Sequence, residues 1–190
     1  MKAYLPNDVW YEGIPNVKRV NKTGYVVIPD NKYTPPVHMR GGSIIPIADD
    51  REHVNTDTVR NGNFTLMVLP GRGHTGQGEL FWDDGDSIDT IENNNYNHLV
   101  FNLGKDCELD INVIQNKYPS NKFIQDVHIY GTNGDKVEAT LDGKPIPTYY
   151  VDNIENPLKI AININLNSKK VGDKWTLKWK SIKTNSCNFV

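Results

Sequence analysis

Apolar and polar residues alternate along the second half of the chain, with the period of a strand that buries one face. Residues 107–113 place Cys, Leu, Ile and Val at every second position, and residues 160–166 do the same with Ile and Leu. Residues 175–180 alternate Trp or Leu with Thr or Lys. Frequent turn sequences separate these runs, including Asn133-Gly134, a strong two-residue hairpin signal. The pattern predicts an all-β fold of two antiparallel β-sandwich domains, with Trp175 and Trp179 in a core.

Short apolar runs that end at proline predict further strands in the first half. Residues 24–28 and 64–69 are such runs, followed by Pro29 and Pro70. Residues 71–78 then form a glycine-rich loop that leads into a strand over 79–82. The loop lacks the lysine and the following helix of a phosphate-binding loop. We therefore predict a flexible hairpin tip at this position.

The stretch over residues 35–46 combines a Pro-Pro pair, a single charge at Arg40 and the pair Gly41-Gly42. Two prolines favour an extended approach, and two glycines permit a tight bend or a close approach of two chains. We expect two strands joined by a bend, with a guanidinium at that bend. The structural interpretation is a bulge in which Arg40 pairs with a nearby carboxylate or with backbone carbonyls.

Composition limits the classes of function. The chain has 190 residues, 37% hydrophobic and 23% charged, which is enough to bury a core in one large or two small domains. A net charge of −2 gives no basic field for nucleic acid. No apolar run approaches the roughly 18 residues of a membrane span, and the first residues lack the core of a signal peptide. Residues 83–95 turn acidic and then asparagine-rich, so we predict domains over 1–84 and 85–190.

The sequence predicts no catalytic, metal-binding or cofactor-binding residue. Its five histidines lack the spacing and cysteine companions of a zinc site, and there is no nucleophile elbow. The carboxylates over residues 83–89 do not match the calcium loop of an EF-hand. A glycosidase needs two carboxyls roughly 5 to 9.5 Å apart on either side of the scissile bond, which neighbours in one turn do not provide. These acids are interpreted as a solvated turn that binds its own backbone.

The oxidation state of the two cysteines and the use of two glycosylation sequons depend on the cellular compartment of the protein. Cys107 shares the apolar face of its strand, which favours a buried free thiol, and a disulfide with Cys187 is the alternative in an oxidising environment. Asn21 and Asn63 fit the N-glycosylation sequon, which becomes relevant only in a secreted protein.

Three motifs resemble, in this order and at these separations, the region after the barrel in glycoside hydrolase family 31. They are Ala-Tyr-Leu-Pro with Val-Trp-Tyr over residues 3–11, Val-His-Met-Arg-Gly-Gly-Ser-Ile-Ile-Pro over 37–46, and Gly-Glu-Leu-Phe-Trp-Asp-Asp-Gly-Asp-Ser-Ile-Asp over 78–89. The likeness is to α-glucosidases of the intestinal maltase, sucrase-isomaltase and lysosomal acid α-glucosidase type. Residues 127–131 and 175–177 are similar more loosely.

The resemblance implies a piece of an enzyme without its catalytic machinery. In that family a (β/α)₈ barrel holds two catalytic aspartates, and proximal and distal C-terminal β-domains follow it. This chain matches only those two β-domains, and the barrel motif Trp-x-Asp-Met-Asn-Glu is absent from it. No catalytic residue therefore carries over. The implied parent is a retaining exo-α-glucosidase that acts on maltose-like α-1,4-glucosides outside the cell, in the secretory pathway or in the lysosome.

Three functions follow as hypotheses. The favoured one is a scaffold that packs on the absent barrel and stabilises it, with an apolar surface around residues 37–47. The candidate interface residues are Trp10, Tyr11, Arg40, Ile44 and Ile45. The second is weak α-glucan binding through exposed aromatic residues, for which Trp10, Tyr33 and Tyr149-Tyr150 are the candidates. The third is a protein-interaction domain, such as a secreted antigen.

Overall fold

The computed structural model describes residues 2–14, 17–29, 33, 35–48, 55–60, 62–132, 136–150, 159–163, 169–187 and 189. Within these ranges the regular secondary structure is almost entirely β-strand. The helical elements described are one turn of α-helix, α1 (Thr56–Val59), and one of 3₁₀ helix, η1 (Arg72–His74). The prediction of an all-β fold is confirmed.

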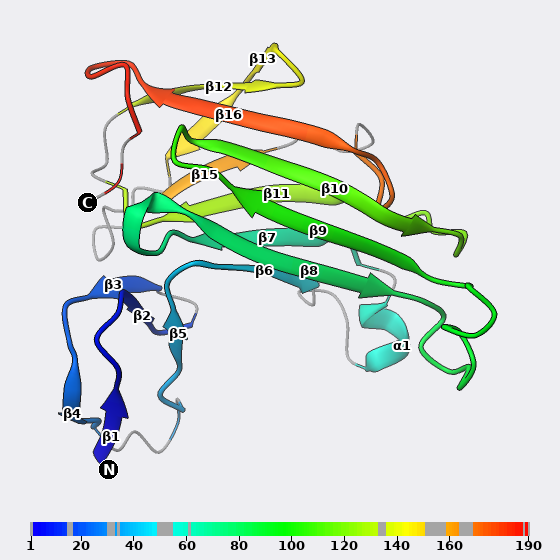
Figure 1. Cartoon of the computed structure of the whole chain (residues 1–190), viewed down its shortest axis with the longest axis horizontal. Helices are drawn as coiled ribbons and strands as arrows, with labels where there is room; N and C mark the ends of the chain where they lie inside the picture. The colour runs from blue at the N-terminus through cyan, green and yellow to red at the C-terminus, as the bar shows by residue number, and fades with distance from the viewer. Residues whose placement is uncertain are drawn as a thin grey trace.

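Most strands belong to one large sheet of eleven strands. From edge to edge it contains β13 (Lys144–Ile146), β12 (Val137–Leu141), β16 (Trp175–Ser181), β10 (Glu108–Asn116), β9 (Asn97–Leu103), β8 (Gly76–Trp82), β6 (Ser43–Ala48), β7 (Phe64–Leu69), β11 (Ile124–Tyr130), β15 (Lys159–Asn163) and β14 (Thr148–Tyr150). Pairing is antiparallel except between β11 and β7 and between β6 and β8. The sheet curls so that its two halves face each other, which makes the fold sandwich-like (Figure 1).

One apolar core fills the space between the two halves. Leu66 and Val68 of β7 and Ile129 of β11 enter it from one half, and Trp175 and Trp179 of β16 enter it from the other. Both tryptophans are buried, as their alternating pattern predicts. The apolar residues at every second position of β9, β10 and β12 complete the core. The buried apolar area of this cluster is the main term that holds the curled sheet together.

The large sheet runs across residue 84. Strand β8 pairs with β9 along its whole length, from Gly76 opposite Leu103 to Trp82 opposite Asn97. The acidic and asparagine-rich residues 83–96 form the connection between these two strands. The division into 1–84 and 85–190 stays a prediction, and strands from both sides of it share one sheet.

Two hairpins expected from turn sequences are not formed. Strands β7 and β8 are separated by β6, so the loop over residues 71–75 joins strands that do not pair. Glycine permits this arrangement, since a Cβ at Gly78 would lie 1.9 Å from the carbonyl oxygen of Ile44. Asn133 and Gly134 lie outside the described residues, and the flanking strands β11 and β12 pair with other strands in opposite halves of the sheet.

Two small sheets precede the large one in the chain. Strands β3 (Lys18–Val20), β2 (Trp10–Glu12) and β5 (His38–Arg40) form a three-stranded sheet, and β1 (Lys2–Leu5) pairs with β4 (Gly24–Val27). The three-stranded sheet covers the outer face of β7 and β11 through a second cluster of buried residues: Tyr11, Val17, Met67, Leu69 and Tyr130. The hydroxyl of Tyr11 donates a 2.9 Å hydrogen bond to the carbonyl of Pro70, which fixes this contact.

Alkaline pH is expected to loosen this second cluster. Burial raises the pKa of Tyr11 and of Tyr130 to about 12 each. Since an unfolded tyrosine titrates near a pH of about 10, the folded state holds these protons more tightly. The stabilisation that these two buried, protonated tyrosines give is therefore complete below a pH of about 10. It is lost as the pH rises toward about 12.

Urea unfolding across that pH window tests this expectation. Tyr11→Phe should show a shallower fall in the free energy of unfolding, because only Tyr130 then remains to titrate in the cluster. An equal fall in the variant and the original chain would show that Tyr11 does not titrate as a buried group.

Candidate domain interface

The two-stranded ribbon of β1 and β4 turns an aromatic face to solvent. Tyr4 lies opposite Tyr25 in the register, and their rings meet edge to face with centroids 5.2 Å apart. Val27 lies on the same face, opposite Lys2. Tyr25 is 83% exposed, Val27 73% and Tyr4 60%. The other face of the ribbon points toward the rest of the chain, where Leu5 is buried.

This ribbon has little support from its own chain. Within the described residues β1 and β4 pair only with each other. The ribbon projects from the three-stranded sheet on the side away from the large sheet (Figure 1). A lone two-stranded ribbon is marginally stable in water, and an exposed cluster of large apolar side chains usually marks a contact with a partner. The exposed face is therefore the candidate interface.

A groove of about 320 Å³ lies beside the ribbon. Its apolar wall is made by residues 26–29 and 35–37, and its polar wall includes Glu12, Lys18, Lys22 and His38. Glu12 lies 3.3 Å from the ammonium of Lys18 and 3.0 Å from that of Lys22. Burial by itself raises the pKa of Glu12, but hydrogen bonds from Lys22 and Lys18 outweigh this effect and hold it below its usual range. The groove adds a second apolar surface, next to an ion-paired rim.

Arg40 pairs with a carboxylate, as the structural interpretation of the bend predicts. Its Nε and Nη2 atoms each lie 2.7 Å from Oδ2 of Asp8. Arg72, from η1, approaches the other carboxylate oxygen at 3.7 Å and donates a 2.6 Å hydrogen bond to the side chain of Asn7. The hydrogen bond from Arg40 holds the pKa of Asp8 below its usual range. These contacts brace the connection between β1 and β2 against the η1 loop.

The structure places the other predicted interface residues mostly inside the chain. Tyr11 and Ile44 are buried in the two cores. Ile45 packs against the second cluster, and Trp10 is half-buried. Exposed large apolar side chains therefore gather on the ribbon more than on residues 37–47, where Ile47 is exposed, and further ones such as Ile88 and Ile114 lie elsewhere on the chain. Sequence reasoning missed Tyr4 and Tyr25, because the register that pairs them joins segments about twenty residues apart and has no local signature.

The two sequons differ in their surroundings. Asn21 is exposed in the connection between β3 and β4. Asn63 is half-buried: its Oδ1 accepts a 3.1 Å hydrogen bond from the backbone of Phe123, and its Nδ2 lies 3.3 Å from Gln125. A glycan on Asn63 would be attached to Nδ2, the atom that already contacts Gln125. Asn21 is the sequon that the fold leaves open.

Of the candidate aromatic residues for sugar binding, the structure describes the side chains of Trp10 and Tyr33. Tyr33 is exposed. Tyr149 and Tyr150 belong to β14, and their side chains lie outside what the structure describes. Trp10 donates its indole N–H to the carbonyl of Pro6, at 2.9 Å.

The acidic turn binds its own backbone. Asp83 accepts a hydrogen bond from the N–H of Gly85, and Asp84 accepts from those of Asp86 and Ser87. The hydroxyl of Ser87 donates to Asp84 at 2.6 Å and, with these N–H groups, lowers the pKa of Asp84 to about 2. In the described part of the chain no three His, Cys, Asp or Glu side chains gather as a metal site would require. No described helix has the length and apolar character needed to cross a membrane.

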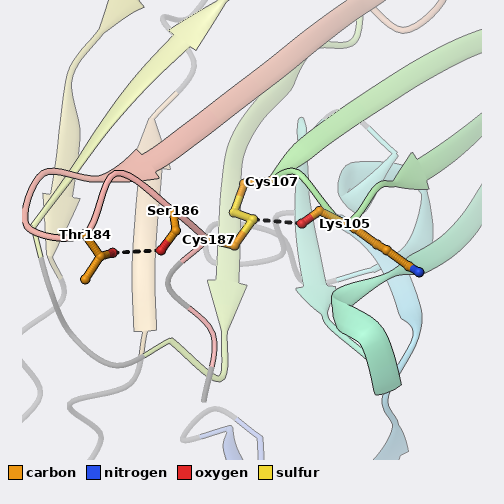
Figure 2. Close-up of a disulfide and its surroundings, with 5 residues drawn as sticks. All are labelled: Lys105, Cys107, Thr184, Ser186 and Cys187. Carbon is orange, nitrogen blue, oxygen red and sulfur yellow. Dashed lines mark hydrogen bonds between the residues drawn. A yellow bond between two sulfur atoms is a disulfide. The ribbon is translucent and has the colours of Figure 1, made fainter.

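Cys107 and Cys187 form a disulfide (Figure 2). Cys107, immediately before β10, is buried as its alternating pattern predicts, but it is not a free thiol. The bond ties β10 to the C-terminal segment that follows β16, and the sulfur of Cys187 lies 3.0 Å from the carbonyl oxygen of Lys105. The hydroxyl groups of Thr184 and Ser186 meet at 2.9 Å in the same segment.

Comparisons with known proteins give this fold a family context. Human intestinal sucrase-isomaltase is 28% identical over 190 residues, which cover 96% of this chain and 10% of that protein. Human probable maltase-glucoamylase 2 is 31% identical over 136 residues, which cover 70% of this chain and 5% of that protein. The homologues of this chain are glucosidases of glycoside hydrolase family 31. The chain spans only a small part of each family 31 relative.

The fold is also found in a solved family 31 glucosidase. In the crystal structure of the ER glucosidase II heterodimeric complex, 21% of the matched chain superposes on 94% of this chain with a TM-score of 0.71 and 18% identity. No family model matches the sequence.

Proposed function

We propose that this chain is the non-catalytic C-terminal region of a family 31 α-glucosidase, where it packs on the catalytic barrel and stabilises it. The small share of each relative that it covers supports this assignment. The parent would remove terminal α-1,4-linked glucose from maltose-like oligosaccharides. The Cys107–Cys187 disulfide supports a parent in the secretory pathway, the lysosome or outside the cell.

The exposed aromatic face of the ribbon carries this proposal. Tyr4, Tyr25 and Val27 face water on an element that, among the strands the structure describes, has no other sheet partner. Interfaces between domains of one chain typically bury roughly 600 to 1,500 Å², and the ribbon with its neighbouring groove supplies a surface suited to such a contact. The barrel of the same polypeptide is the partner we assign, because most of each relative lies outside the matched segment.

Removing this apolar surface is expected to weaken the parent enzyme. Tyr25→Ser with Val27→Thr should lower the free energy of unfolding of the catalytic part by about 3 kcal/mol, since each fully buried large side chain contributes about 1.5–3 kcal/mol. In the isolated chain the same double substitution should reduce binding of a hydrophobic dye and self-association without lowering its melting temperature. Thermal unfolding, dye fluorescence and sedimentation measure these effects.

Ile114→Thr is the matched control, because Ile114 is also exposed but lies on β10 of the large sheet. It should change none of the three measurements in the isolated chain. An isolated chain that stays monomeric, binds no dye and is indifferent to the double substitution would count against the interface. In that case the ribbon face is an ordinary solvent surface.

A further inference from the structure

A polar cleft of about 720 Å³ opens where the Gly41–Gly42 bend, the η1 loop and strands β8 and β9 meet. Glycine backbone lines much of it, so a ligand can approach the main chain closely. Eight polar side chains and Leu103 complete its lining; the polar ones are Asp8, Arg40, Ser43, Arg72, Thr75, Gln77, Asn102 and Asp110. It lies apart from the ribbon face described above, and nothing in the proposed packing role makes use of it.

The charges of the cleft compensate one another. Its two aspartates and two arginines give no net charge, and both arginines approach Asp8. Asp110 accepts a 2.6 Å hydrogen bond from the hydroxyl of Thr176. The amide of Gln77 lies 3.3 Å from that of Asn102. The cleft therefore presents many hydrogen-bond donors and acceptors without the excess charge that would favour an ion.

An aromatic platform continues the same face of β8. Side chains at alternate positions of a strand share one face, so Gln77, Glu79 and Phe81 form a row, with Phe81 roughly 13 Å from Gln77. Glu79 pairs with His98 at 2.9 Å. Phe81 is 45% exposed and stacks on Tyr96 with ring centroids 4.8 Å apart. The cleft and the platform thus form one continuous surface along the outer side of β8 and β9.

We propose that this surface binds a neutral oligosaccharide. A sugar ring presents an apolar face that packs on an aromatic ring and a rim of hydroxyl groups that donate and accept hydrogen bonds. Phe81 supplies the ring, and Gln77, Asn102 and the paired charges supply partners for the hydroxyls. Shallow sites of a few polar groups and one aromatic anchor suit weak, millimolar binding. The inference does not rest on the proposed packing role.

Titration of the isolated chain with maltoheptaose and with sulfated maltoheptaose, followed by NMR, tests this site. Neutral maltoheptaose is expected to bind saturably, with shifts at β8 and β9. Phe81→Ala and, separately, Gln77→Ala should each weaken binding by about fivefold to tenfold, the loss expected for one stacking or hydrogen-bonding partner. Unchanged circular dichroism and melting temperature establish that each variant is folded.

Tyr25→Ala is the matched control, an exposed aromatic residue on the ribbon instead of the large sheet. It should bind maltoheptaose as the original chain does. Absence of saturable binding, binding of the sulfated ligand alone, or an equal loss in Tyr25→Ala would overturn the proposal.

Discussion

Loss of the disulfide between Cys107 and Cys187 is expected to lower the free energy of unfolding by about 4 kcal/mol. The two cysteines are separated by 80 positions, and the cross-link removes the many conformations that this long loop samples in the unfolded chain. Without the bond, the segment after β16 keeps its non-covalent contacts, such as the hydrogen bond from Ile182 to the carbonyl of Lys136 and the packing of Phe189 on Trp179. This is among the largest effects that one covalent change can have on the chain.

Urea unfolding of the oxidised and the reduced chain measures the effect. The double variant Cys107→Ala with Cys187→Ala serves as the second comparison, because it has no thiol that can form a new cross-link. Cys107 is fully buried, so the double variant should be less stable than the reduced chain by the additional cost of a small cavity. Equal stability of the oxidised and reduced chains would show that the bond does not constrain the unfolded state.

Gly78→Ala is expected to destabilise the chain by about 3 kcal/mol or more, at the upper end of the range for overpacked sites. A Cβ at this position would lie 1.9 Å from the carbonyl oxygen of Ile44 and 2.8 Å from its carbonyl carbon. Both are backbone atoms of β6, which is held on its other side by the β6–β7 ladder. They cannot move away without breaking that pairing.

Gly104→Ala is the control for this substitution. The nearest atom to a Cβ at Gly104 is the carbonyl oxygen of Glu108, 3.7 Å away, which is an ordinary contact. The free energy of unfolding of the Gly104→Ala variant should stay within about 1 kcal/mol of that of the original chain. If Gly78→Ala unfolds at the same urea concentration as Gly104→Ala, β8 does not approach β6 as closely as the structure shows.

Local sequence patterns determined the strands and their buried faces. The alternation over residues 107–113 and 175–180 correctly predicted the buried side of β10 and β16, because a period of two puts one set of side chains on one face. The acidic turn was predictable for a similar reason, since aspartate side chains bind backbone N–H groups only two or three residues ahead. The motifs over residues 3–11, 37–46 and 78–89 indicated the family to which the homologues of this chain belong.

Only the tertiary structure decided which strands are neighbours and what covers each face. Nothing in the run over residues 64–82 shows that β6 inserts between β7 and β8, because strand pairing depends on segments distant in the chain. The same limit explains why the sequence did not predict which residues of the candidate interface are exposed. Tyr11 and Ile44 were predicted to be available to a partner but are buried, whereas Tyr4 and Tyr25 are exposed. Alternation shows that one face of a strand is buried, but the element that buries it is fixed by long-range packing. The disulfide was settled in the same way, by a fold that brings the Cα atoms of Cys107 and Cys187 to 5.5 Å.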